Sequence, residues 1–184
     1  VQQKSSANDT RSGYYCGPAT AYMMLKFLGY STSKHNSSHS LTQDRLASST
    51  YLNTITVKAT KWDSKVMETG IKAWTKDALR YRQINAPTVA VVKGKLINRI
   101  GRNGQPFAAD TVEFTGGKHY NGHPNRTIGH WIAAKGYTNS GNTATWVDPA
   151  IPRFLNNDGL GKTSFSEPTS SFTADYLQSN GILG

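Results

Sequence analysis

Three residues whose side chains work together in covalent catalysis stand at separate places in this chain: Cys16, His130 and Asp148. A deprotonated thiol is a nucleophile, an imidazole takes up its proton near neutral pH, and a carboxylate fixes the tautomer and orientation of the imidazole. Cys16 is the only cysteine among 184 residues, so it forms no internal disulfide. Acyl transfer through a thioester is the chemistry that this set predicts.

The segment around Cys16 predicts a loop that delivers a thiol to the first turn of an amphipathic helix. It reads GYYCGPATAYMMLKFLG from Gly13 to Gly29. Pro18 suits a first helical turn, apolar residues recur at helical spacing, and Gly29 suits the helix exit. The unpaired N–H groups and the dipole of a helix start favour a thiolate there. The alternative is that Cys16 is a small buried core residue.

A later segment predicts a β-hairpin that carries a base and its partner. Residues 127–150 contain two strand-like runs joined by a turn at residues 139–142. His130 opens the first strand, and Asp148 closes the second strand 18 residues later. Because antiparallel pairing brings both residues to the same end of the hairpin, we expect Asp148 to bond the imidazole. The alternative is a core histidine and an aspartate that merely begins a turn.

The remaining periodicities indicate an α+β domain. Helical spacing predicts helices at 41–52 and 64–80, a further short helix is expected at 174–178, and a β-branched run predicts a buried central strand at 87–94. A Ser-rich segment predicts a loop at 31–40, and a segment rich in Gly, Asn and Pro predicts a loop at 99–126. We therefore expect a single domain over residues 1–184. Its helical part, at about 13–80, packs on an antiparallel strand-rich part at about 87–184.

Three motifs, in the order YYCGPATAYMML, GHWIAAKGY and WVDP, resemble those of bacterial papain-like cysteine peptidases of the bacteriocin-processing-peptidase type. LTQDRLASSTYLNT resembles the short helix after the nucleophile helix of that group, and PTVAVVKG resembles the strand before its histidine. The resemblance covers most of residues 1–149. It implies a papain-like fold and thiol-dependent cleavage of peptide or protein substrates without a cofactor. Cys16 is then the nucleophile, His130 the general base and acid, and Asp148 the orienting group.

The same resemblance implies a glutamine before the nucleophile, whose side chain helps to stabilise the oxyanion. In the family it usually stands six positions before the cysteine, and this chain has Thr10 there. Gln3 takes the role if about seven residues loop out before the helix, and it is favoured over Gln2 and Asn8. The alternative is a frayed terminal side chain in solvent. If none of these residues reaches Cys16, the site is weakened or inactive.

Charge and composition limit the partners. The formal net charge is +10 at pH 7, which favours binding to an anionic cell-surface polymer. The positive charge is scattered and follows no nucleic-acid-binding motif, so no nucleic acid is expected. Richness in Ser, Thr, Asn, Gly and Tyr is typical of secreted bacterial proteins, and we expect an extracellular location. No apolar run approaches the roughly 20 residues of a membrane span.

Two further histidines, His119 and His123, are spaced as metal ligands on one helix face would be. Gly122 and Pro124 predict a loop there instead, and no cysteine or carboxylate clusters with the pair in the sequence. We therefore expect no metal site.

The leading hypothesis is a secreted cysteine peptidase. A deamidase or a transpeptidase would use the same triad and thioester and would differ only in the amide recognised or the acceptor admitted. A hypothesis of another class is a non-catalytic cell-surface binding module on a decayed peptidase scaffold. The absence of a glutamine at the usual position supports that alternative.

Overall fold

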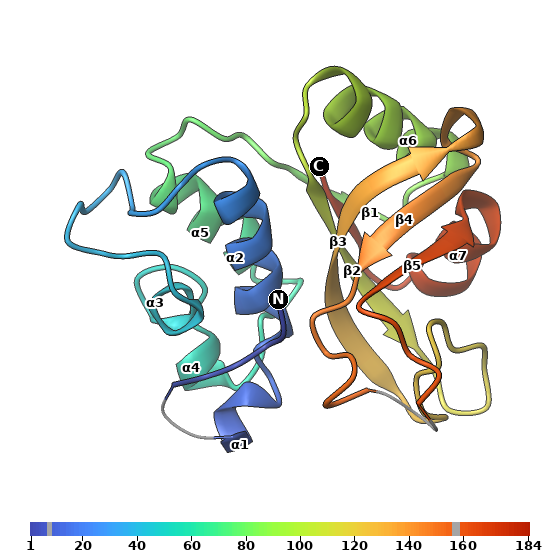
Figure 1. The fold of residues 1–184 in the computed structure, drawn as a ribbon, viewed down its shortest axis with the longest axis horizontal. Coiled ribbons are helices and arrows are strands. Elements are labelled where there is room, and N and C mark those ends of the chain that lie inside the picture. The colour runs from blue at the N-terminus through green and yellow to red at the C-terminus, as the bar shows by residue number, and fades with distance from the viewer. Residues whose placement is uncertain (7–8, 156–158) are drawn as a thin grey trace. The chain divides into compact units, whose positions relative to one another are not determined.

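Helices occupy the first half of the chain and an antiparallel sheet the second half (Figure 1). The computed structural model describes residues 1–6, 9–155 and 159–184. These divide into a helical unit, Val1 with Gln3–Gln83, and a sheet unit, Gln2 with Ile84–Gly184. The α+β class is thereby confirmed. That the whole chain is one domain stays a prediction.

The helical unit is built around one long helix. Its helices are α1 (Asp9–Ser12), α2 (Cys16–Phe27), α3 (Gln43–Ala47), α4 (Thr54–Val57) and α5 (Val66–Trp74). Helix α2 packs against α3 and α5 and buries Met24 and Leu25. Both short partners lie inside the helices predicted at 41–52 and 64–80. In the part of the chain that the structure describes, no helix has the length and apolar character of a membrane span.

The first turn of helix α3 binds Tyr15, the residue that precedes Cys16. Its N-cap is Thr42, whose hydroxyl accepts a hydrogen bond from the Arg45 N–H at 3.0 Å. Asp44 in its first turn accepts a bond from the Tyr15 hydroxyl at 3.0 Å and one from the Ser5 hydroxyl at 2.9 Å. The N-terminal segment and the start of α2 are therefore tied to the same carboxylate.

Gly17 leaves no room for a side chain. A β-carbon at this position would overlap the side chain of Thr60, whose hydroxyl is bonded to that of Thr54 at 2.7 Å. We expect Gly17→Ala to destabilise the protein by about 1–3 kcal/mol, because the added methyl group overlaps Thr60, which is tied to Thr54 by its hydrogen bond. Thermal unfolding measures this effect. Gly94→Ala is the matched control, since nothing lies within 4 Å of a β-carbon there. Equal melting temperatures for the two variants would contradict the close packing at Gly17.

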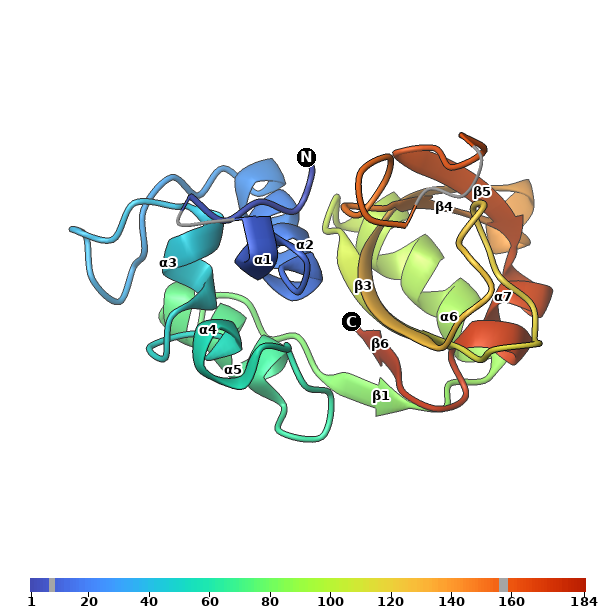
Figure 2. The ribbon, with the colours of Figure 1, turned by 90° about the horizontal axis from the view of Figure 1, so that it is seen from below.

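The sheet unit contains six strands in the order β1-β6-β2-β3-β4-β5. The strands are β1 (Gln83–Asn85), β2 (Phe107–Glu113), β3 (Ile128–Thr138), β4 (Thr143–Val147), β5 (Ser164–Pro168) and β6 (Gly181–Leu183). The sheet curves around helix α6 (Val89–Lys95), and α7 (Thr169–Tyr176) lies beside that helix (Figure 2). Trp146 stacks on Phe172 of α7 with ring centroids 4.7 Å apart, so aromatic side chains fill the space between sheet and helix.

The predicted hairpin is confirmed. β3 and β4 pair antiparallel, and the short 3-10 turn η2 (Asn139–Gly141) joins them. Ser140 has a left-handed backbone in that turn, with φ of 53°. The last pair of the ladder is Ala133 with Val147. Asp148 follows immediately, so it leaves the ladder at the end of the hairpin where His130 lies.

The strand predicted at 87–94 is wrong, because this segment forms helix α6. Thr88 caps the helix by accepting a bond from the Val91 N–H, and Val92 and Leu96 are both buried. Ala90 is exposed although it would share a strand face with the buried Val92, whereas Val92 and Leu96 share one face of a helix. The cap therefore outweighs the β-branched composition, and this segment is not the strand before the histidine.

The loop predicted at 99–126 is also wrong in its first half. It contains the end of a π-helical turn, η1 (Leu96–Arg102), and the whole of β2. Polar residues concealed this strand, since Asp110, Thr111 and Glu113 are all buried. Residues 114–127 alone are the loop between β2 and β3.

Candidate functional site

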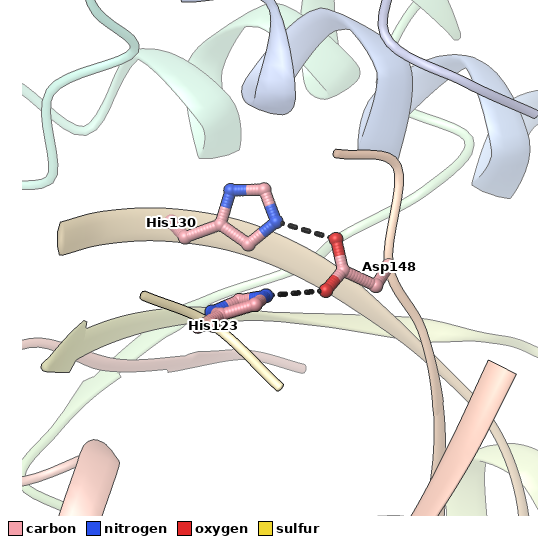
Figure 3. A group of neighbouring side chains, drawn as sticks. All are labelled: His123, His130 and Asp148. Carbon is pink, nitrogen blue, oxygen red and sulfur yellow. Dashed lines mark hydrogen bonds and ion pairs between the residues drawn. The ribbon is translucent and has the colours of Figure 1, made fainter. Parts of the chain in front are cut away.

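His130 and Asp148 form a buried pair at the end of the hairpin. The Nε2 atom of His130 lies 2.8 Å from Oδ1 of Asp148, and both side chains are almost wholly buried (Figure 3). His130 is the third residue of β3, and Asp148 directly follows β4. The expected contact between the two is therefore present. A proton on Nε2 shared with the carboxylate leaves Nδ1 as the basic nitrogen of the neutral ring.

Four donors fix the Asp148 carboxylate. Oδ1 accepts from His130 and from the Ala150 N–H at 2.9 Å. Oδ2 accepts from Nε2 of His123 at 2.7 Å and from the Asn121 amide at 3.1 Å. A carboxylate has about four lone-pair sites, so this one is saturated and cannot rotate without losing bonds.

The same surroundings keep Asp148 ionised. Burial by itself would raise the pKa of this carboxyl group, but the charge of His130 and the hydrogen bonds from His123 and His130 outweigh it. The pKa of Asp148 is consequently held far below its ordinary value. An anionic partner is what an imidazole needs in order to accept a proton at its other nitrogen.

The contacts continue beyond Asp148 into the loop between β2 and β3. Nδ1 of His123 lies 2.6 Å from Oε1 of Glu113, and Nδ1 of His119 lies 2.7 Å from Oε2 of the same carboxylate. The inference that no carboxylate clusters with these histidines is therefore wrong. Glu113 stands six residues before His119 and Asp148 stands 25 residues after His123, and the loop and the sheet bring the four residues together.

The register of the sheet explains the position of Glu113. Thr111 of β2 stands opposite His130 of β3, and the Thr111 hydroxyl donates to the His130 carbonyl oxygen at 2.9 Å. Side chains two residues apart on a strand point to the same face. Glu113 therefore points to the face that carries His130. The sequence FAADTVE has no alternation of apolar and polar residues, so this strand left no period-2 signal.

The polar atoms of His123, His130 and Asp148 lie closer together than the ligand atoms of a metal site. His123, His130 and Asp148 offer three ligand atoms within 4.8 Å of one another. Their N···O separations of 2.7 and 2.8 Å are hydrogen-bond distances, whereas two ligands of one tetrahedral zinc lie about 3.3 Å apart. Each imidazole also faces its own carboxylate oxygen. The geometry is that of shared protons, and we assign no metal to these residues.

Cys16 belongs to the helical unit, where it is the first residue of the 12-residue helix α2. Its side chain is partly exposed, so it is not the fully buried core cysteine of the alternative interpretation. The N-cap residue Tyr15 makes no side-chain hydrogen bond to the first turn. The thiol thus lies at the positive end of the helix dipole, as the sequence predicts.

Gln3 is held in the interior of the helical unit and is not frayed. Its side-chain N–H groups donate to the carbonyl oxygens of Ser12 at 2.9 Å and Gly13 at 3.2 Å. Its Oε1 atom is buried and finds no hydrogen-bond partner among the described residues. Of the two other amides, Gln2 donates to the Ile151 carbonyl oxygen at 3.5 Å. Asn8 lies outside the residues that the structure describes.

Comparison with known proteins places the chain in a family. It matches the sequence model of the Peptidase_C39 like family over residues 1–176, a span that includes Cys16, His130 and Asp148. A search of curated proteins finds no match. Since the family match covers almost the whole chain, the chain belongs to the Peptidase_C39 like family, and its type is that of a papain-like cysteine peptidase.

Proposed function

We propose that this protein is a secreted cysteine peptidase that cleaves peptide bonds with Cys16 as nucleophile, His130 as base and acid, and Asp148 as orienting group. One observation carries the proposal: a saturated, anionic Asp148 bonded to Nε2 of His130 at 2.8 Å. Family membership supports the same chemistry, and so does the position of the only cysteine at the start of α2.

The proposed reaction begins with the thiol. Nδ1 of His130 takes the proton from Cys16 as Sγ attacks the substrate carbonyl carbon and a C–S bond forms. The C–N bond then breaks, and the imidazolium gives its proton to the leaving amine. A water molecule next attacks the thioester while His130 takes its proton. The C–S bond breaks, the acid is released, and the proton returns to Cys16.

We further propose an anionic cell-surface polymer as a docking partner. The net charge of +10 supports this idea, because a strongly cationic protein is attracted to anionic polymers. Such attraction weakens steeply with ionic strength. Binding to an anionic wall polymer that is unchanged by added salt would contradict the proposal.

A non-catalytic binding module is the second candidate function, and one observation favours it. Both hydrogens of the Gln3 amide have backbone acceptors, so an oxyanion would have to displace one of them.

In the peptidase, one of the two Gln3 bonds must open for the oxyanion. The bond to Gly13 is the longer of the two, at 3.2 Å. We propose that this bond is the one exchanged for the oxyanion during catalysis.

We expect Gln3→Ala to lower kcat about 100-fold, since it removes one oxyanion donor. Hydrolysis of a fluorogenic peptide measures this change. Gln43→Ala is the matched control, because Gln43 binds the Lys4 N–H at 2.8 Å and so holds the same N-terminal segment. That variant should stay within about threefold of the wild type. A Gln3→Ala protein with wild-type kcat would remove Gln3 from the mechanism.

Product analysis tests the function itself. The full chain is incubated with an unfolded casein-like protein, and the products are examined for new N-termini, released ammonia and ligated peptides. New N-termini alone support the peptidase. Ammonia without cleavage identifies a deamidase, and ligation identifies a transpeptidase, because each chemistry resolves the same thioester differently.

Alkylation separates an enzyme from a binding module without any substrate. Iodoacetamide is applied between about pH 4 and 9, because only the thiolate reacts. Rapid modification at mildly acidic pH that is slowed by His130→Ala supports an activated Cys16. An ordinary thiol reactivity, equal in both proteins, would overturn the enzymatic proposal.

A further inference from the structure

We propose that His123 and Glu113 form a charged clamp that positions Asp148 through Oδ2, the oxygen that His130 does not bind. The inference rests on the proposed function, because the clamp acts through Asp148 on the proposed base. His123 and Glu113 are positioning residues in this scheme, since neither is placed against the substrate. The clamp lies entirely within the sheet unit.

The hydrogen-bond geometry suits a charged ring at His123 between two ionised carboxylates. Its two nitrogens lie 2.6 Å from Oε1 of Glu113 and 2.7 Å from Oδ2 of Asp148. Ionised carboxylates only accept hydrogen bonds, so both ring nitrogens must donate. A ring that donates from both nitrogens is an imidazolium. All three side chains are fully buried, which strengthens the attraction between opposite charges.

The arrangement gives each imidazole its own carboxylate oxygen. Figure 3 shows the His123 and His130 rings lying next to each other, with His130 facing Oδ1 and His123 facing Oδ2 of Asp148. Glu113 balances the charge of His123, which leaves the charge of Asp148 to stabilise an imidazolium at His130 during the reaction. Without Glu113, two rings would compete for one carboxylate, and a neutral His123 would give Asp148 a weaker hydrogen bond than a charged ring does.

Aromatic side chains keep His123 in one orientation. The His123 ring packs on Tyr120 at 4.4 Å between centroids, and Tyr120 stacks on Phe165 at 5.2 Å. Glu113 also accepts from His119, whose side chain is only slightly exposed. The other titratable neighbours are His130, at 5.6 Å between ring centroids, and the phenols of Tyr120 and Tyr176. Phenols are neutral near pH 7.

The pKa of His123 agrees with this geometry. Burial by itself would lower it, but the hydrogen bonds and charges of Asp148 and Glu113 outweigh burial and raise the pKa above its ordinary value. Because the pKa is raised in the folded state, the imidazolium stabilises the fold at low pH. That contribution is lost as the pH rises through the folded-state value.

The test compares Glu113→Gln with His119→Gln in the full chain. Both changes remove a partner of the His119–Glu113 bond, but only the first removes the charge that faces His123. We expect Glu113→Gln to lower kcat on a fluorogenic peptide about tenfold, with KM within about twofold, because a charge-assisted bond is lost. It should also lower the pKa of His123 in ¹⁵N-histidine NMR spectra. His119→Gln should leave both quantities near those of the wild type.

The ¹⁵N-histidine NMR spectrum of the wild type tests the clamp even if Glu113→Gln fails to fold. His123 with protons on both ring nitrogens at about pH 7.5 supports the clamp, since an ordinary histidine is neutral there. A neutral His123 overturns it. A folded Glu113→Gln protein with unchanged kcat also overturns the clamp while leaving the peptidase intact. A wild type that cleaves nothing and has an ordinary thiol refutes the proposed function instead.

Discussion

Replacing Cys16 with alanine should lower peptide cleavage by about 10⁴-fold or more, to the background of the assay. The reason is chemical: no other cysteine exists in the chain, so no other thiol is available to form the thioester. Cleavage of a fluorogenic peptide measures the loss. Mass spectrometry after incubation with a peptide aldehyde or chloromethyl ketone should show an adduct on the wild type and none on Cys16→Ala.

The effect of this substitution on stability should be small. Cys16 is partly exposed at the first turn of α2, so alanine leaves little empty volume and suits the helix. Thermal unfolding of Cys16→Ala should therefore resemble that of the wild type. If Cys16→Ala still cleaves peptides at the wild-type rate, the protein is not a cysteine peptidase.

Asp148→Asn should lower kcat by about 10³-fold to 10⁴-fold. The carboxylate accepts from four donors, on His130, Ala150, His123 and Asn121. A carboxamide offers one acceptor oxygen and two N–H groups, so donors face donors on one side of it. The His130 ring then loses either its preferred tautomer or its orientation. Hydrolysis of a fluorogenic peptide measures this loss.

Asp175→Asn is the matched control for removing a carboxylate from the sheet unit. Asp175 pairs with the exposed Lys118 at 2.9 Å, and a surface pair of this kind contributes little to stability. Its kcat should stay within about twofold of the wild type. If Asp148→Asn is folded and equally active, Asp148 does not orient the base, and the proposed triad must be abandoned.

Several elements followed from the sequence because local interactions decide them. The hairpin needed only two strand-like runs and a turn rich in Asn and Gly, and the contact between His130 and Asp148 follows from its register. The start of α2 at Cys16 follows from the Gly-Pro pair and the apolar spacing behind it. These features involve residues that are near in sequence or joined by one short turn.

Other elements were misjudged because burial by distant residues decides them. Residues 87–94 have a strand-like composition, yet the Thr88 cap and the burial of Val92 make them a helix. β2 contains the buried acidic residues Asp110 and Glu113, which are typical of a loop when the sequence is considered alone. Their hydrogen-bond partners come from other parts of the sheet unit. Asn180 donates to Asp110 at 2.9 Å, and such a partner, 70 residues away, is invisible to local patterns.

By itself, the sequence determined the α+β class, the family, the helix that begins at Cys16 and the pairing of His130 with Asp148. Only the tertiary structure decided that His123, bonded to Glu113, holds Oδ2 of Asp148, and that Gln3 is buried against the loop before α2. The physical reason is the distance along the sequence over which each interaction acts. Helix caps, turns and strand alternation act over a few residues, whereas a buried charge is stabilised by whichever partners the folded sheet brings to it.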